Sequence, residues 1–348
     1  MPQINKPTDY FNTVLYTGNG GTNAVTGVGF QPDWVWVKDR TSVNSHGTFD
    51  IIRGATNDLS TDLTNGTLTN ANYLQSFDSD GFTLGSEGVF NTNTNNYVNW
   101  NWLADNTTGS SNTNGTITST VSANTTSGFS ICTYTGNGTS GATFGHGLNS
   151  APDMVIIKQR NSTGNWRVGH VGADSTFAQV LNLNLTNAAG TANSIFNSTA
   201  PTSSVVTLGN EGDANGNGNT FVAYCFHSVK GYSKFGRYTG NGNADGTFVY
   251  TGFKPAWIMI KESSNAGNSW HIRDNKRSTF NVVNDSMYAN SNIAEVSNNS
   301  ALNTDFLSNG FKLRNSDTND NGSGRTYIYM AFAEQPLVGT NNIPATAR

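Results

Sequence analysis

The five-residue sequence Tyr-Thr-Gly-Asn-Gly occurs three times in this 348-residue chain, beginning at Tyr16, Tyr134 and Tyr238. Successive copies are 118 and 104 residues apart. These spacings are too long for a solenoid or a propeller blade and are close to the length of a small domain. The chain is therefore predicted to contain three copies of one unit, each long enough to hold its own core.

Further signals follow each copy in the same order. A proline and an apolar run that ends in lysine come first, then a large aromatic residue that opens a short strand, then an aromatic run that closes the unit. This longer register makes the repeat convincing in a chain so rich in Gly and Asn. The lysines are Lys38, Lys158 and Lys261, the aromatic residues are Phe49, Trp166 and Trp270, and the closing runs span residues 97–102, 221–226 and 327–332.

The composition favours strands and turns over helices. Charged residues make up only 12% of the chain, and aromatic residues make up 11%. Asn, Ser and Gly compete with helical hydrogen bonding, whereas Thr and aromatic residues suit a pleated surface. We expect an all-β fold of three tandem antiparallel β-sandwich modules, for which a jelly-roll-like arrangement is one possibility.

The lysine-ending strands are apolar on both faces. In the first repeat Trp34 and Trp36 alternate with Val35 and Val37. A strand of this kind is covered on both sides, so it lies centrally or beneath a neighbouring module.

Composition also suggests the domain boundaries. The stretch 104–127 is almost entirely Asn, Thr, Ser and Gly, which predicts a flexible or extended linker. Little slack separates the second and third repeats, so we expect them to pack together. The predicted division is an N-terminal arm 1–10, repeats 11–103, 128–230 and 231–334, the linker 104–127, and a C-terminal tail 335–348.

Several classes of function are disfavoured. The net charge of −4 leaves no basic stripe for nucleic acid. The sequence contains no run of 18 apolar residues, so no membrane insertion is predicted. Residues 1–10 lack the apolar region of a secretory signal. The two cysteines, Cys132 and Cys225, are expected to be buried free thiols that can be neighbours in one sheet.

No catalytic constellation is recognisable. The five histidines lack metal-ligand spacing. Glu87 and Glu211 occupy matching places in the first two repeats, where Arg314 begins the corresponding stretch of the third, and we interpret them as loop residues that cap turns. Lys38, Lys158 and Lys261 are expected to reach solvent or a loop carboxylate.

A bound calcium ion is the one cofactor that the sequence suggests. Asp213 and Asp317 each begin an Asp-x-Asn-x-Asn-Gly-like stretch, half of a calcium loop. Position 328, the twelfth of the second stretch, is Ile rather than Glu, so this is not an EF-hand. Such loops are also ordinary hairpin turns, so the expectation is that no cofactor is bound, with calcium as the alternative.

Sugar binding is the most specific positive hypothesis. Aromatic rings beside amide side chains are the means by which neutral glycans are held. Most tryptophans recur at core-type strand positions. Trp166 and Trp270 follow polar loops and are therefore the better candidates for exposed stacking platforms, but a repeated core position is the favoured interpretation.

The combined motif resembles a repeated domain of uncertain function found in structural proteins of marine bacteriophages. The resemblance covers residues 15–334 and rests on Tyr-Thr-Gly-Asn-Gly, on Gly-Phe-x-Pro-Asp-x-Val-x-Val-Lys-x-Arg and on the closing aromatic strand. The third repeat departs from the motif at Pro255-Ala256 and lacks the arginine found at Arg40 and Arg160. The family supplies no catalytic residues to transfer.

The resemblance implies a virion protein assembled in the host cytoplasm. Its expected partners are other tail or capsid proteins and host surface glycans, and a trimer or hexamer is expected in the particle. The expected role is a non-enzymatic tail fibre, tip or knob component that contributes to host adhesion. The alternatives are a capsid-surface decoration or cement protein, and a carbohydrate-active enzyme or free lectin.

Overall fold

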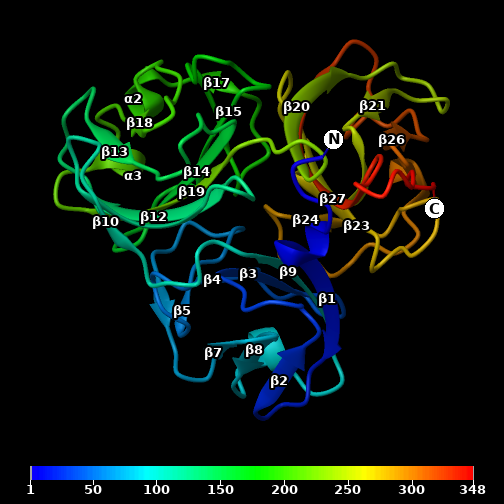
Figure 1. Cartoon of the computed structure of the whole chain (residues 1–348), viewed down its shortest axis with the longest axis horizontal. Coiled ribbons are helices and arrows are strands. Elements are labelled where there is room, and N and C mark those ends of the chain that lie inside the picture. The colour runs from blue at the N-terminus through cyan, green and yellow to red at the C-terminus, as the bar shows by residue number, and fades with distance from the viewer. Residues whose placement is uncertain (1, 348) are drawn as a thin grey trace.

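The computed structural model describes residues 2–347, which form a nearly all-β protein built from antiparallel sheets. Figure 1 shows three lobes around a common centre, one for each repeat of the sequence. Within residues 2–347, no helix has the length and apolar character needed to cross a membrane.

The larger sheet of the first repeat places the closing aromatic strand in the middle. Its strand order is β1-β9-β3-β4. Thus the strand that leads into Tyr-Thr-Gly-Asn-Gly pairs with the closing strand, and the closing strand pairs with the lysine-ending strand. The strands are β1 (Phe11–Thr17), β9 (Asn96–Trp102), β3 (Trp34–Asp39) and β4 (Gly47–Asp50).

The same order recurs in the other two repeats, as β12-β19-β14-β15 and β20-β27-β22-β23. The third repeat adds β24 at one edge, and the second adds β16 and β17. The strands are β12 (Phe129–Thr135), β19 (Thr220–Phe226), β14 (Met154–Gln159), β15 (Arg167–His170), β16 (Gln179–Asn182), β17 (Gly190–Thr191), β20 (Ser233–Thr239), β27 (Thr326–Pro336), β22 (Phe253–Glu262), β23 (His271–Asp274) and β24 (Met287–Tyr288).

The stretch 104–127 differs from its prediction as a linker. It contributes β10 (Ser110–Asn112) and β11 (Ser119–Asn124), which extend the second sheet beyond β12. Val121 is buried there opposite Cys132. Ser and Thr therefore form strands at this side of the sheet because neighbouring strands supply their hydrogen-bond partners.

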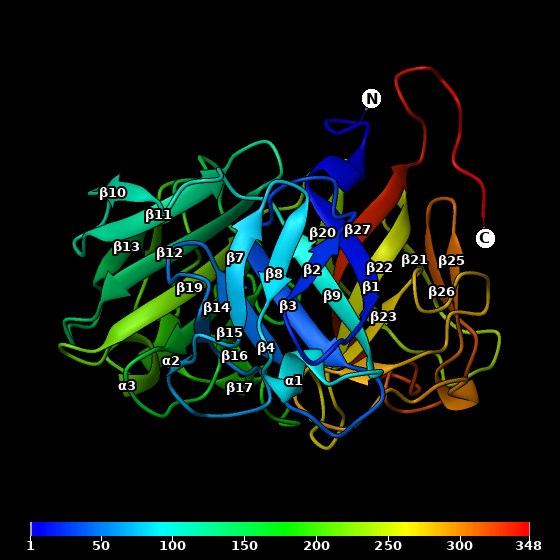
Figure 2. The same cartoon turned by 90° about the horizontal axis from the view of Figure 1, so that it is seen from below.

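A smaller sheet lies against one face of each larger sheet. Figure 2 looks onto the first repeat, where β2, β7 and β8 lie in front of β3 and β9. In that repeat Val35 and Val37 pack with Phe82 and Leu84 in a core of their own. The strands are β2 (Asn23–Thr26), β8 (Gly81–Leu84) and β7 (Leu74–Asp78); β13 (Thr143–Gly145) and β18 (Val205–Thr207); β21 (Phe248–Tyr250), β26 (Gly310–Leu313) and β25 (Thr304–Leu307); and the separate pair β5 (Asn57–Asp58) and β6 (Leu68–Thr69).

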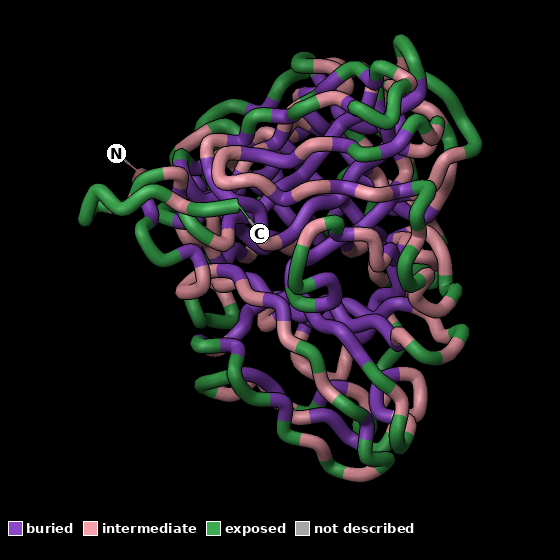
Figure 3. Tube along the Cα trace, turned by 90° about the vertical axis from the view of Figure 1, so that its right-hand side faces the viewer, coloured by how far each residue is buried: buried purple, intermediate pink, exposed green. Residues whose placement is uncertain are grey.

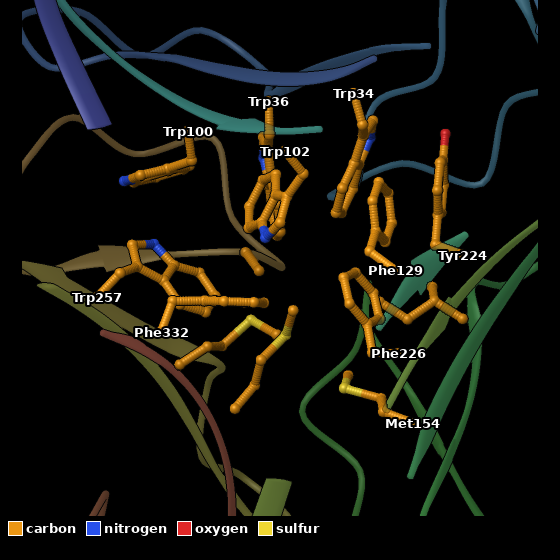
Figure 4. Close-up of a cluster of buried hydrophobic side chains, with 14 of the residues drawn as sticks. Trp34, Trp36, Trp100, Trp102, Phe129, Met154, Tyr224, Phe226, Trp257 and Phe332 are labelled. Carbon is orange, nitrogen blue, oxygen red and sulfur yellow. The ribbon is translucent and has the colours of Figure 1, made fainter. Parts of the chain in front are cut away.

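The opposite faces of the larger sheets meet in one shared aromatic core. Figure 4 shows Trp34 and Trp102 of the first repeat beside Phe226 of the second and Trp257 of the third. Both faces of β3 are buried, which confirms the prediction that this strand is covered on both sides. All seven tryptophans belong to this core.

The helices are single turns in the connections, and both ends of the chain emerge on the same side of the molecule (Figure 3). The N-terminal arm packs on the rest of the chain, because Ile4 is buried and the Gln3 N–H donates to the Lys230 carbonyl at 3.0 Å. The helical turns are η1 (Pro7–Asp9), α1 (Gly88–Asn91), α2 (Asn193–Phe196), α3 (Gly212–Asn215) and η2 (Ser300–Leu302).

The two cysteines are placed as the sequence indicated. Cys132 lies on β12 and Cys225 on the adjacent β19, and both are buried free thiols. Burial raises the pKa of the Cys225 thiol well above its ordinary value, so this group stays protonated and acts as a small core residue.

Candidate functional site

The repeated tyrosines anchor the chain that precedes each closing strand. Each hydroxyl donates to a backbone carbonyl about 80 residues away in sequence, and each acceptor immediately precedes a buried asparagine. The bonds are Tyr16 to Phe90 at 2.6 Å, Tyr134 to Ala214 at 2.7 Å and Tyr238 to Asp320 at 2.6 Å.

The buried asparagines complete the explanation of the repeated sequence. Asn215 accepts the Asn137 N–H at 2.9 Å and donates to the carbonyls of Gly209 and Thr139 at 2.7 and 3.0 Å. Gly216, which follows Asn215, leaves no space for a side chain at Gly136, because an added Cβ would lie 2.5 Å from the Gly216 oxygen. Asn91 and Asn321 make the corresponding bonds in the other repeats. Tyr-Thr-Gly-Asn-Gly is therefore a structural turn, and sequence reasoning missed the asparagines because each contacts its turn only in the folded chain.

Replacing Asn215 by aspartate is expected to lower the free energy of unfolding by about 3 kcal/mol. The change keeps the shape but removes two donors and turns a buried carboxylate toward two carbonyl oxygens. Urea denaturation measures the loss. Asn217→Asp, on the exposed part of the same turn, is the matched control and should change stability by less than about 0.5 kcal/mol. Equal losses in the two variants would contradict the buried role.

The three recurring lysines are buried, which corrects the prediction that they reach solvent or a loop carboxylate. Lys38, Lys158 and Lys261 are at most 1% exposed, and each ammonium group donates to backbone carbonyls. Burial lowers the pKa of each to about 8. Two of them also cross between repeats, since Lys158 Nζ lies 2.7 Å from the Thr64 oxygen and Lys261 Nζ lies 3.3 Å from the Thr186 oxygen. Acceptors in a neighbouring repeat therefore hold these ammonium groups inside.

Trp166 and Trp270 are also buried, so the expectation of exposed stacking platforms is wrong. They are at most 1% exposed. Trp166 Nε1 donates to the Ser60 carbonyl of the first repeat at 3.0 Å, and Trp270 Nε1 donates to the Asn182 carbonyl of the second at 2.9 Å. Polar loops do precede them, but the loops of another repeat cover the rings.

The third member of this set is His46, not Phe49. Strand pairing places Asp50, His170 and Asp274 opposite Trp34, Met154 and Trp257, so His46 occupies the place of Trp166 and Trp270. His46 Nε2 lies 2.9 Å from the Tyr288 carbonyl of the third repeat. Each repeat therefore contacts the preceding one through the same position, and the first contacts the third.

A backbone hydrogen bond repeats this cyclic pattern. Each bond joins a loop of one repeat to the residue two positions after the buried lysine of the next. The three bonds are Thr67 N–H to the Arg160 carbonyl at 2.7 Å, Ala189 N–H to the Ser263 carbonyl at 2.9 Å, and Glu295 N–H to the Arg40 carbonyl at 3.0 Å. The contacts between repeats thus form a closed ring.

Two of the three interfaces carry a buried ion pair. Asp50 pairs with Arg53 and accepts the hydroxyl of Tyr224 from the second repeat at 2.7 Å. Asp274 pairs with Arg277 at 2.6 Å and accepts the indole N–H of Trp100 from the first repeat at 3.1 Å. All four charged side chains are 0% exposed.

The second–third interface has His170 and Ala173 at the corresponding positions. His170 Nδ1 accepts the Gly172 N–H at 2.9 Å, which leaves Nε2 to donate to the Tyr329 carbonyl of the third repeat at 3.2 Å. This geometry requires the neutral ring, and burial lowers the pKa of His170 to about 4.

His170 is therefore expected to make the protein acid-sensitive. A depressed histidine pKa contributes stability that is present above about pH 6.5 and is lost as the pH falls toward 4. Between pH 7 and pH 5 the free energy of unfolding of the native protein should fall by about 2 kcal/mol more than that of the His170→Asn variant. The other titrating groups are the same in both proteins and cancel in the comparison. Urea denaturation at both pH values measures this difference. Identical losses in the two proteins would contradict the neutral buried ring.

The candidate calcium ligands have partners within the chain. Asp213 Oδ2 lies 2.9 Å from Arg167 Nη2, and Asp317 Oδ1 accepts the Asn319 N–H at 2.8 Å. Among residues 2–347, no three His, Cys, Asp or Glu side chains gather to hold a metal. Asp317 precedes the buried Asn321 by the same number of residues as Glu87 precedes Asn91 and Glu211 precedes Asn215. Asp317, and not the stretch that begins at Arg314, is therefore the counterpart of the two glutamates.

The exposed aromatic residues lie in the third repeat and were not singled out from the sequence. Phe248 and Tyr250 project from the outer face of β21 with 43% and 54% exposure, and Phe280 is 76% exposed. The strands that correspond to β21 carry Ala24 and Thr26, and Thr143 and Gly145, at the matching places. Comparison among the repeats is the signal that finds these residues.

Together these contacts define an all-β protein whose repeats close around one aromatic core. The chain belongs to a family described as a domain of unknown function (DUF7483), whose model matches residues 6–336. Neither the curated proteins nor the solved structures include a match.

Proposed function

We propose that the chain is a non-enzymatic structural protein of a bacteriophage particle. In this proposal it consists of three tandem β-sandwich modules, residues 11–103, 128–230 and 231–334, with arm 1–10 and tail 335–348. The motif resemblance suggests this class of protein. The observation that carries the proposal is the closed ring of three backbone bonds between repeats, from Thr67 to Arg160, from Ala189 to Ser263 and from Glu295 to Arg40.

Closure of the ring supports a structural role for a physical reason. Homologous surfaces that join head to tail generate either a closed ring or an open filament. Here one chain closes the ring itself and buries every tryptophan at its centre. The product is a rigid block with pseudo-threefold symmetry, which suits a threefold or sixfold position in a larger assembly. A trimer or hexamer of such blocks in the particle is part of the proposal.

The favoured location is an exposed tail fibre, tip or knob that adheres to host surface glycans. The outer surface is poor in charge and rich in amides and hydroxyls. Phe248 and Tyr250 are exposed, unlike Trp166 and Trp270, although the Lys234 ammonium group lies over one face of the Tyr250 ring. Several copies on a particle would turn weak glycan contacts into useful avidity.

A capsid-surface decoration or cement role is the second candidate. The placement of the two termini favours it, because the Asn5 amide donates to the Thr340 hydroxyl at 2.6 Å and brings the arm and the tail together. The paired ends could anchor one face of the block to neighbouring capsid subunits.

Immunogold labelling of purified particles tests the proposal. Label at the tail end would support adhesion, and label over the capsid would support the decoration role. Particles that carry none of the protein would reject a virion function and favour a free lectin or a carbohydrate-active enzyme.

A further inference from the structure

The three interfaces differ at one pair of positions although their backbones bond in the same way. One position follows each buried lysine by two residues, and the other donates the N–H of the interface bond. The third–first interface has Arg40 and Glu295, the first–second has Arg160 and Thr67, and the second–third has Ser263 and Ala189.

The third–first interface shows what this position binds. Arg40 Nε and Nη2 donate to the two carboxylate oxygens of Glu295 at 3.0 and 2.7 Å. Arg277 Nη1 lies 3.1 Å from the same carboxylate. The paired arginines lower the pKa of Glu295 although its burial opposes this. Arg40 thus binds the carboxylate in bidentate geometry, and Arg277 adds a single further bond.

The first–second interface has the arginines but lacks that carboxylate. Arg160 corresponds to Arg40, and Arg53 corresponds to Arg277, while Thr67 replaces Glu295. The Asp50 carboxylate is already engaged by Arg53 and Tyr224. Burial and the neighbouring Arg53 lower the pKa of the Arg160 guanidinium. Arg160 therefore lacks a counterpart of the carboxylate that binds Arg40 at the third–first interface.

One donor of the Arg160 side chain lacks an acceptor in the part of the chain that the structure describes. Its Nε is buried and has no hydrogen-bond partner among residues 2–347. The same part of the chain offers Arg160 no ion pair, whereas Arg40 has one at 2.7 Å. Arg160 is half-buried, so an anion that reaches its guanidinium from solvent would gain a charge-assisted hydrogen bond.

A surface pocket of about 420 Å³ lies at this position. Arg160 lines it together with the loops 65–68 and 161–163. These loops supply polar side chains from Asn65, Thr67, Ser162 and Thr163 and the exposed apolar side chain of Leu68, whereas the Asn161 amide is bonded to Asn219 and Thr220. This volume is in the range of small-ligand sites, and one cation beside neutral polar groups and an apolar side chain suits an anion that carries both hydroxyl groups and an apolar ring face.

We propose that the Arg160 pocket binds an acidic sugar. Its carboxylate would occupy the place that Glu295 occupies beside Arg40, and its hydroxyls would contact the amide and hydroxyl rim. The inference deepens the proposed adhesive function by naming uronic or sialic acid units as the recognised class.

Titration calorimetry tests the pocket with methyl β-glucuronide, the methyl glycoside of N-acetylneuraminic acid, and methyl β-glucoside as the neutral analogue. At least one acidic sugar is expected to bind at least tenfold more tightly than the glucoside. Equal affinity for the acidic and neutral sugars, or no binding of either acidic sugar, would overturn the proposal. Tighter binding of N-acetyl-aspartate amide would overturn it in favour of an acidic protein partner.

Two substitutions at Thr67 provide the matched comparison. Thr67→Glu supplies the missing carboxylate from within the chain, so it should weaken acidic-sugar binding at least tenfold while raising the midpoint of thermal unfolding. Thr67→Gln has similar size without the charge and should bind more tightly than Thr67→Glu. Equal binding by the two variants would overturn the proposal, and the unfolding midpoint shows that each is folded.

Particle labelling separates this inference from the function on which it rests. Sugar binding by a protein that is absent from particles would reject the virion role and leave the Arg160 site intact. A protein present on particles but unable to bind either acidic sugar would reject the Arg160 site and leave the virion role intact.

Discussion

Replacement of Arg53 by alanine is expected to lower the free energy of unfolding by about 3 to 5 kcal/mol. The Arg53 side chain is 0% exposed, and its removal leaves the buried carboxylate of Asp50 without its cation. It also removes the guanidinium donors that lie 2.8 Å from the carbonyls of Thr48 and Asn57, of which the Thr48 carbonyl retains the Leu59 N–H. Most of the loss is the desolvation of an unpaired charge, which packing does not offset. Urea denaturation at pH 7 measures it.

The second–third interface supplies a natural control for this substitution. His170 and Ala173 stand there where the first–second interface has Asp50 and Arg53. The double substitution Asp50→His with Arg53→Ala removes both charges and should recover at least half of the stability lost in Arg53→Ala. A double variant no more stable than the single one would show that the stranded carboxylate is not the cause.

The sequence predicted those features of the fold that local pattern determines. The scarcity of helix formers indicated an all-β protein, and the alternation of Trp34 and Trp36 with Val35 and Val37 indicated a strand covered on both faces. The free cysteines followed in the same way. Each of these properties depends on the residues of one strand and its immediate surroundings.

The errors concern residues whose partners lie in another repeat. Lysine is rarely buried without a partner, and no residue near Lys158 in the sequence predicts that the Thr64 carbonyl supplies an acceptor. Trp166 looked exposed because polar loops precede it, but the Ser60 carbonyl and its loop cover the ring. The sequence pattern indicates Phe49 in place of His46, because histidine fills the position that tryptophan fills in the other two repeats.

Those same contacts between repeats have an energetic consequence. Trp34 stacks on Tyr224 of the second repeat with ring centroids 4.3 Å apart and also contacts Trp102 at 4.4 Å. It is 1% exposed, and its indole N–H has no partner among residues 2–347, so its contribution is packing alone. Trp34→Ala is expected to lower the free energy of unfolding by about 3 to 5 kcal/mol.

The loss at Trp34 should appear in the whole chain at once. Because the core is shared, far-ultraviolet circular dichroism, which reports the strands of all three repeats, should give the same lowered midpoint in urea as tryptophan fluorescence. Phe280→Ala is the aromatic control and should change stability by less than about 0.5 kcal/mol, since that ring is 76% exposed. Two separate transitions in Trp34→Ala would mean that the repeats unfold independently. In that case the aromatic centre would join three stable domains rather than hold one cooperative fold together.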